Sequence, residues 1–171
     1  MTDPTTSKAL RRTYGTFATG VTVVTVGGAA PHGMTANSFT TVSLDPALVL
    51  VCVARDAIMH EALVENGTFG VSVLASHQEA IARHFADNDR PLGQAQFDYV
   101  DWEPGLISGV PLIGGAAAQY ECGLWRSYDG GDHTIFVGNL LATQRRQEEN
   151  VLVFLHGRFR QLEQAPRHLV S

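Results

Sequence analysis

The sequence predicts a mainly β fold, in which an antiparallel barrel carries a few peripheral α-helices. The chain contains about eight short segments rich in β-branched and aromatic residues, separated by glycine-containing turns, as is typical of antiparallel sheets. Its three short stretches with helical spacing do not alternate regularly with these strands, which argues against a doubly wound parallel sheet. No glycine run matches a Rossmann or P-loop motif, so any nucleotide must bind without those turns.

The N-terminal part is predicted to contain one helix followed by three strands. Residues 7–18 place apolar side chains at helical spacing, and Thr19-Gly20 ends the segment. Residues 21–28 form a β-branched strand that two glycines stop. Strands over residues 33–46 and 47–54 follow, and they meet at Asp45-Pro46 because proline cannot donate to a central ladder.

The rest of the chain is predicted to add two helices and five strands around a loop-rich segment. Residues 58–66 form a short helix with Asp56 as its N-cap and Gly67 at its end. A second helix is expected over residues 77–86, and residues 87–110 are loop-rich. The remaining strands are expected over residues 68–75, 116–128, 133–144, 151–155 and 158–162.

The composition indicates one ordinary globular domain over residues 1–171. The chain is 44% hydrophobic and 17% charged, which is sufficient for a core and unlike a disordered segment. Its net charge is −5 and its basic residues form no long run, so we expect no nucleic-acid partner. The longest apolar run, residues 47–54, is too short to span a membrane, and the first ten residues lack the apolar centre of a signal peptide.

The two cysteines are predicted to be free thiols. Cys52 and Cys122 lie in apolar strand-like segments, and neither has a second cysteine or a histidine at metal-ligand spacing. Buried thiols of a cytoplasmic protein are therefore expected, with no disulfide and no metal site.

The predicted strand over residues 33–46 is polar on both faces. Because side chains alternate along a strand, this strand presents hydroxyl and amide groups in two sets: Thr35, Asn37, Thr41 and Ser43 on one face, Ser38 and Thr40 on the other. A half-buried strand is normally polar on one face only. The pattern indicates either the ordinary β preference of threonine or a ligand held by the backbone and hydroxyls of this strand.

Three stretches together resemble the signature segments of the flavin reductase-like family. They are FATGVTVVT at 17–25, GMTANSFTTVSLDPALVLVCV at 33–53 and GDHTIFVGNL at 131–140, in family order. The resemblance covers a core of about residues 10–162. It implies an antiparallel split β-barrel with Greek-key topology, and an NAD(P)H:flavin oxidoreductase that supplies reduced flavin to a partner monooxygenase. It also implies a homodimer.

The resemblance implies a flavin site built from three parts of the chain. Small side chains in the first part let a strand backbone approach the flavin edge, and the N-terminus of the following helix suits a phosphate. The residues are Thr35, Ala36, Asn37, Ser38, Phe39, Thr41 and Val42; then Arg55, Asp56, Ala57, Ile58, Met59 and His60; and finally Phe85. Many relatives carry Ser, Thr or Lys in the second part, so FAD and FMN both stay open. The alternatives are a solvated charge for Arg55 and a core position for Phe85.

The resemblance also implies a nicotinamide site. Its residues are His133, after a glycine turn, and the segment His156, Gly157, Arg158 and Phe159. Arg158 is placed to pair with a pyrophosphate through its planar guanidinium, the alternative being an exposed charge at the barrel rim. NADH is the expected donor, while the neighbouring Arg158 and Arg160 leave NADPH open. Asn139 departs from the family, in which glutamate is common at this place.

The implied chemistry requires no catalytic side chain. A hydride passes from the nicotinamide C4 to the flavin N5, so the protein needs only to stack and align the two nucleotides. Two other functions stay open at this point. One is a flavoprotein oxidase of the pyridoxamine phosphate oxidase-like type with tightly bound flavin, and the other is a non-enzymatic flavin- or haem-binding module on the same barrel.

Overall fold

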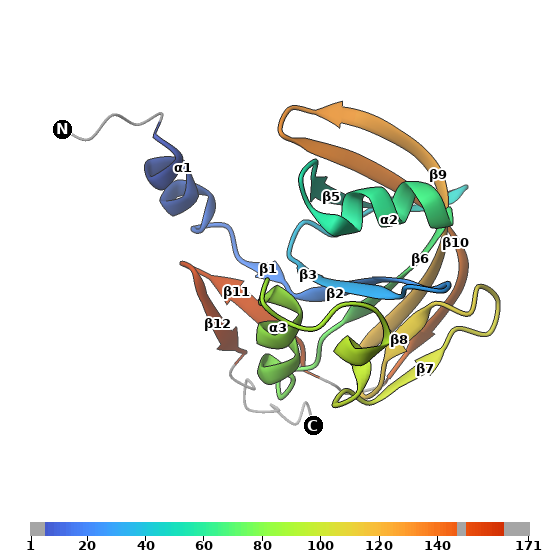
Figure 1. Cartoon of the computed structure of the whole chain (residues 1–171). Helices are drawn as coiled ribbons and strands as arrows, with labels where there is room; N and C mark the ends of the chain where they lie inside the picture. The colour runs from blue at the N-terminus through green and yellow to red at the C-terminus, as the bar shows by residue number, and fades with distance from the viewer. Residues whose placement is uncertain (1–5, 147–149, 163–171) are drawn as a thin grey trace, which may run out of the picture.

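The computed structural model describes residues 6–146 and 150–162, and its centre is a seven-stranded antiparallel sheet (Figure 1). The strand order is β3-β2-β6-β9-β10-β5-β4. In chain order these strands are β2 (Thr22–Val26), β3 (His32–Ala36), β4 (Thr40–Leu44), β5 (Ala47–Ala54), β6 (Thr68–Val73), β9 (Ala118–Gly130) and β10 (His133–Arg145). The predicted fold class, mainly antiparallel β with a few helices, is confirmed.

Within the described ranges, two small sheets, three α-helices and one 3-10 turn surround this sheet. One small sheet contains β1 (Thr19–Gly20), β11 (Leu152–Leu155) and β12 (Arg158–Gln161); the other is the hairpin of β7 (Trp102–Pro104) and β8 (Pro111–Ile113). The helices are α1 (Ser7–Tyr14), α2 (Ile58–Asn66), α3 (Glu79–Ala86) and the 3-10 turn η1 (Gly93–Phe97). No helix in the described ranges is long and apolar enough to cross a membrane.

The two edge strands of the large sheet are consecutive in the chain. β3 and β4 stand at opposite ends of the strand order, yet only residues 37–39 separate them. Four residue steps span at most about 14 Å, so the sheet curls until its edges approach each other. Ser38 fixes this junction to β5, because its Oγ donates to the Cys52 carbonyl (2.9 Å) and accepts from the Cys52 N–H (3.1 Å).

This junction corrects the prediction of one continuous strand over residues 33–46. The strand ends at Ala36 and a new one begins at Thr40, because the chain passes there from one edge of the sheet to the other. The side chains before and after the junction therefore belong to different strands and do not alternate about one plane. The predicted division of the polar residues into two faces is wrong for this reason.

The other element boundaries agree more closely with those predicted from the sequence. α2 covers the predicted residues 58–66, and Gly67 closes it in the left-handed region at φ +65°. Its N-cap is Ala57, without a side-chain hydrogen bond, in place of the predicted Asp56. α1 ends at Tyr14, earlier than predicted, and the loop-rich segment contains η1 and β7.

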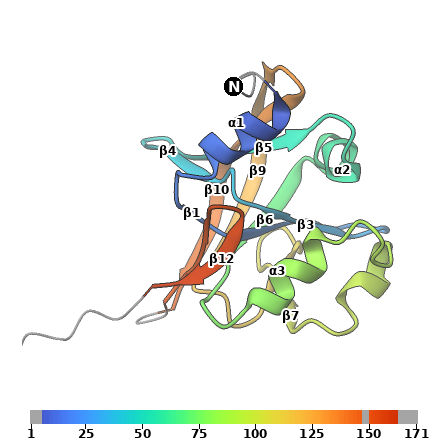
Figure 2. The same ribbon diagram turned by 90° about the vertical axis from the view of Figure 1, so that its left-hand side faces the viewer.

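The core divides into two clusters on the two sides of β2 and β3. Figures 1 and 2 place α2 and α3 on opposite sides of these strands. Met59 and Leu63 of α2 belong to the cluster that contains Phe69 and Phe136, whereas Phe85 of α3 belongs to the other. All five residues of β2 are buried, because the segment TVVTV faces protein on both sides.

Gly138 marks the closest packing inside the first cluster. A Cβ added at this position in β10 would lie 2.5 Å from Phe69 Cζ and 3.0 Å from Cys122 Cβ. Only glycine lets β10 pass this ring without displacing it.

We expect Gly138→Ala to lower the free energy of unfolding by about 1–3 kcal/mol, because overpacking forces side chains out of their rotamers. Gly20→Ala is the matched control, since a Cβ at Gly20 meets nothing within 4 Å. Urea unfolding of both variants measures the difference. Equal stability of the two variants would contradict the packing described for Phe69.

Candidate functional site

A pocket of about 520 Å³ opens between β3, the start of α2 and the segment that follows α3. It brings together residues from all three parts of the predicted flavin site, namely Thr35, Asp56, Ala57, Ile58, Met59 and Phe85. Its wall also contains residues that the sequence analysis did not select, namely His32, Met34, Ala86, Asn88, Arg90 and Leu92.

The pocket residues differ in how free they are to contact a ligand. Asp56 is exposed and Ile58 is 55% exposed, whereas Met59 and Phe85 are fully buried. The Phe85 ring packs under β3 and would lie 2.6 Å from a Cβ at Gly33, so the core alternative for Phe85 describes its main role. The Thr35 hydroxyl donates to the Ala82 carbonyl (2.7 Å) and thereby ties β3 to α3.

The start of α2 forms one wall of the pocket and suits an anion. No side chain caps this end, because the N-cap residue is Ala57. The first-turn N–H groups of a helix have no partners within the helix, and the helix dipole favours negative charge beside them.

Arg90 supplies the positive charge of the pocket. Its Nη2 donates to the Gly33 carbonyl and lies 3.3 Å from His32 Nε2. Its Nε is buried and has no hydrogen-bond partner in the described residues. A buried donor without a partner is costly, so this atom is a candidate contact for an anionic ligand. The sequence places Arg90 in a loop and carries no signal that the loop folds back onto β3.

His32 is held neutral behind Arg90. Burial of its ring, with the nearby Arg90 charge as the smaller cause, lowers the pKa of His32 to about 4. Only 6% of the residue is exposed. Burial likewise lowers the pKa of Arg90, and the neighbouring Asp87 opposes that shift.

The residues from 36 to 42 do not line this pocket. Ala36 is buried and Asn37 is exposed, while the Ser38 hydroxyl is occupied by Cys52. The Phe39 ring stacks against Tyr120 with 5.4 Å between centroids. Thr41 and Val42 are exposed on the edge strand β4. The first predicted flavin segment is therefore divided between the two edges of the sheet.

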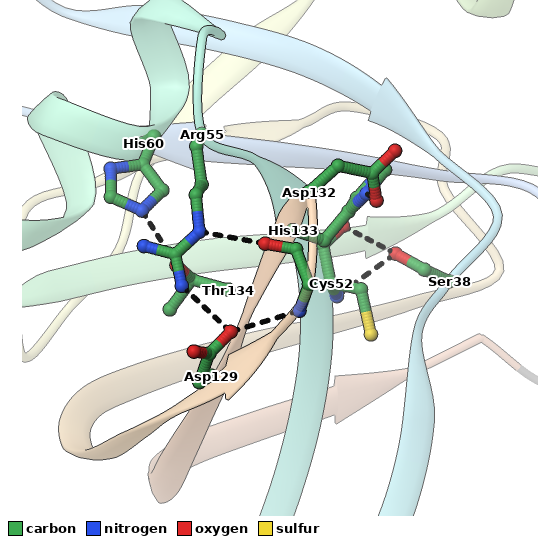
Figure 3. A network of polar contacts seen from close by, with 9 residues as sticks. Ser38, Cys52, Arg55, His60, Asp129, Asp132, His133 and Thr134 are labelled. Atoms are coloured by element: carbon green, nitrogen blue, oxygen red, sulfur yellow. Dashed lines mark hydrogen bonds and ion pairs between the residues drawn. The ribbon is translucent and has the colours of Figure 1, made fainter.

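Arg55 lies outside the pocket and instead clamps the β9–β10 turn (Figure 3). Its Nε donates to the Gly131 carbonyl (2.9 Å) and its Nη2 to Asp129 Oδ1 (2.9 Å). Asp129 Oδ1 also accepts from the Gly131 N–H (2.9 Å), and this bond, followed by the contacts with Arg55, lowers the pKa of Asp129. Exposed ion pairs contribute little to stability because water and salt screen them, so the main effect of this pair is on the conformation of the turn.

The clamped turn carries His133. The His133 Nδ1 lies 2.7 Å from Asp132 Oδ1, and its side chain is 44% exposed. His60 also points toward β10, with its Nε2 2.8 Å from Thr134 Oγ1 (Figure 3). Its ring lies edge-on to Phe136. Arg55 and His60 thus fix β10 to the segment around the start of α2.

His156 and Gly157 form the turn between β11 and β12, and Arg158 and Phe159 begin β12. His156 and Gly157 adopt positive φ values of +53° and +72°. One hollow of about 670 Å³ separates this turn from α1, and its wall contains Lys8, Arg11, Arg12, His156 and Gly157. The three cations of α1 make no ion pair within the described ranges, and the sequence analysis did not select them.

A second hollow, of about 790 Å³, connects this region to the pocket at α2. Its wall contains Arg83, Arg158 and Phe159, together with Gly157, which also lines the hollow beside α1. Ala86 lines both this second hollow and the pocket at α2. Cationic side chains thus line the pocket and both hollows from Arg90 to α1, although the wall of the second hollow also contains Asp87 and its Arg83 pairs with Glu79 (2.6 Å). His133 lines none of these three hollows.

Comparison with known proteins gives consistent matches over nearly the whole chain. Residues 14–163 match the family model described as "Flavin reductase like domain". The chain is 56% identical over 160 residues to an NADH-dependent FAD reductase of Streptomyces globisporus, covering 94% of this chain and 88% of the relative. It superposes with a TM-score of 0.90 and 54% identity on BorF, the flavin reductase component of a bacterial two-component tryptophan halogenase, covering 94% and 100% of the two chains.

A further solved structure contains ligands. It is the Streptomyces globisporus NADH:FAD oxidoreductase in complex with NAD and FAD fragments, with a TM-score of 0.90 and 53% identity over 98% of each chain.

Stability is expected to fall on acidification because of His32. Its pKa of about 4 in the folded chain lies below its ordinary value of 6.5, so between these values the unfolded chain binds a proton that the folded chain does not. The stabilisation is fully present above pH 6.5 and falls as the pH drops toward 4, by on the order of 2 kcal/mol. Urea unfolding at about pH 7 and pH 4.5 should show a smaller loss in His32→Gln than in the wild type. The same loss in both proteins would contradict the assignment.

Arg55→Ala is expected to loosen the β9–β10 turn. The amide protons of Gly131 and His133 should exchange with solvent about tenfold faster, because the side-chain contacts that hold the turn are lost. Arg145→Ala, at the exposed far end of β10, is the control. Arg55→Lys should restore little, because an ammonium does not reproduce the forked geometry of the guanidinium. Unchanged exchange in Arg55→Ala would show that the backbone alone holds the turn.

Proposed function

This chain belongs to the flavin reductase-like domain family, and from this we propose that it is an NADH-dependent flavin reductase that supplies reduced flavin to a separate monooxygenase. The observation that carries the proposal is the similarity to an NADH-dependent FAD reductase over nearly the whole chain. The relatives also include the flavin reductase component of a two-component halogenase. We further propose that residues 1–171 form a single domain of this type.

The flavin phosphate is assigned to the pocket at the start of α2. The uncapped first turn of α2 and the buried, unpartnered Nε of Arg90 are the donors that an anion requires there. Asp56 to Met59 form one wall of this pocket and Thr35 another. The ring system of the flavin is assigned to the polar segment that continues from Thr35 through the sheet junction to Val42. Bound there, the flavin supplies the hydride acceptor of the reaction.

Arg55 and His60 support the flavin site indirectly in this assignment. Both side chains contact the β9–β10 hairpin, so we propose that they orient His133 relative to the start of α2. Many relatives carry Ser, Thr or Lys in the segment that corresponds to residues 55–60, and this chain does not. In this assignment Arg90 supplies the positive charge for the phosphate from another part of the chain.

The nicotinamide nucleotide is assigned to the cationic hollows and to His133. Lys8, Arg11 and Arg12 face the turn at His156, and Arg158 lies in the adjoining hollow. Unpaired cations beside a cavity suit the phosphates of a dinucleotide. We propose NADH as the donor, in line with the name of the similar reductase. No side chain takes a covalent part, and the protein contributes binding and alignment.

We propose that the protein is a cytoplasmic homodimer. Its two cysteines are free thiols, as expected for a reducing compartment. Large apolar side chains are exposed at the end of α1 and just after it, on β4 and on β9, among them Tyr14, Phe17, Leu44 and Trp125. These offer more apolar surface than residues 151–155, where Leu152 is fully buried. A second copy covering α1 would also bring new groups to the cationic hollow, and a monomer in light scattering would overturn this assignment.

The function is tested by NADH oxidation with and without added flavin. The purified protein should oxidise NADH only when free FAD or FMN is present, since the flavin is a substrate that leaves in reduced form. Oxidation without added flavin would instead favour a tightly bound flavoprotein oxidase, and no oxidation at all would favour a binding module.

In the same assay, His133→Ala should raise the KM for NADH by up to about tenfold, because the loss of one hydrogen bond weakens binding by up to that factor. The dissociation constant of the flavin should stay nearly unchanged. His77→Ala, an exposed histidine outside the hollows, is the control. Kinetics like those of the wild type in His133→Ala would overturn the role of this residue, and a fall in turnover at constant KM would place it at the hydride transfer itself.

A further inference from the structure

Met34 places a thioether sulfur in the wall of the pocket at the start of α2. The residue lies on β3, an edge strand of the large sheet, immediately before Thr35, where the segment assigned to the flavin ring begins. Its side chain is partly buried and packs against the core cluster that contains Phe69 and Phe136. Met34 therefore borders both the pocket and the core.

The other sulfur atoms of the described residues are less open to oxidation. Met59 and Cys122 are fully buried. Cys52 is partly buried, but it lines neither the pocket nor the two hollows beside α1 and β12. Burial raises the pKa of the Cys52 thiol, so little of the reactive thiolate forms near neutral pH. Among these four residues, Met34 is the one that combines partial exposure with a place in the pocket wall.

The proposed reaction generates an oxidant beside this sulfur. Dioxygen that meets reduced flavin before a monooxygenase does takes up a hydride equivalent and a proton, which leaves oxidised flavin and hydrogen peroxide. A thioether sulfur donates an electron pair to one peroxide oxygen, the O–O bond breaks, and the other oxygen leaves as water with both protons. The product is methionine sulfoxide, in which the apolar side chain has become polar.

A sulfoxide at this position would disturb the pocket. Met34 is the register partner of Val24, which is fully buried, and a polar group packed against apolar residues without a hydrogen-bond partner is costly. The neighbouring Gly33 accepts from Arg90 through its carbonyl, and Thr35 donates to the Ala82 carbonyl (2.7 Å). A shift of β3 that relieves this cost therefore displaces the residues that form the pocket wall.

We propose that Met34 is oxidised by the peroxide that the enzyme's own reduced flavin generates, and that its sulfoxide weakens flavin binding. The proposal rests on the proposed function. The modification acts as a brake on the enzyme. When no monooxygenase consumes the reduced flavin, peroxide forms, Met34 is oxidised and less flavin is bound and reduced. Methionine sulfoxide reductases regenerate the thioether, so the brake is reversible.

The test incubates the purified protein with NADH and FAD in air, and a second sample with the same mixture without dioxygen. Peptide mass spectrometry should find one added oxygen on Met34 in most molecules of the sample in air and in few of the anaerobic sample, with Met59 unmodified in both. After removal of the nucleotides, fluorescence quenching should show that the dissociation constant of FAD has risen about tenfold in the sample in air. Treatment with a methionine sulfoxide reductase should reverse this rise.

Met34→Leu and Met59→Leu are the matched variants, since each replaces a thioether by an aliphatic side chain of similar volume. Each variant is compared with itself before and after the incubation in air. The dissociation constant of FAD should change less than about twofold in Met34→Leu and should rise as in the wild type in Met59→Leu.

Equal oxidation of Met34 and Met59 would overturn the proposal, and so would a Met34 sulfoxide that leaves FAD binding unchanged. The same rise of the dissociation constant in Met34→Leu as in the wild type would also overturn it. NADH consumption in the same samples separates this inference from the proposed function. Oxidation of NADH in air without oxidation of Met34 overturns the inference alone, whereas the absence of NADH oxidation overturns the proposed function and the inference with it.

Discussion

The closure of the large sheet at residues 37–39 is the constraint on which the rest of the structure depends. Because β3 and β4 are sheet edges that follow each other in the chain, the sheet has to curl, and Ser38 secures the junction by bonding both backbone groups of Cys52. This curvature encloses the cluster around Phe69 and Phe136. It also leaves a short segment at the seam, residues 37–39, that belongs to neither edge strand.

The curvature of the sheet also determines where α2 and α3 lie relative to its two edges. α2 begins directly after β5, the neighbour of one edge, while α3 packs against the other edge through Thr35 and Phe85. The uncapped start of α2 and the arginine that follows α3 therefore meet across β3. The pocket to which we assign the flavin phosphate is thus built from segments that are more than 30 residues apart, with Arg90 contacting Gly33.

The distribution of charge suits an enzyme that aligns two nucleotides and leaves the chemistry to them. The chain as a whole is acidic, yet Arg90, Arg158 and the cations of α1 line the pocket and the two hollows described above. Hydride transfer between nicotinamide and flavin requires proximity and orientation more than acid–base groups. A rigid element such as the Arg55 clamp is consistent with that requirement.

The sequence by itself determined the fold class, the limits of α2 and the start of β10, because these depend on local patterns of apolar residues and on Gly67 and the glycine turn before His133. It also identified the segments around the pocket through their resemblance to a family. Only the tertiary structure decided that residues 33–46 form two strands, that Arg55 faces Asp129, and that Arg90 and the α1 cations line hollows of the surface. These features depend on contacts between distant parts of the chain, and no local periodicity encodes which loops the curled sheet brings together.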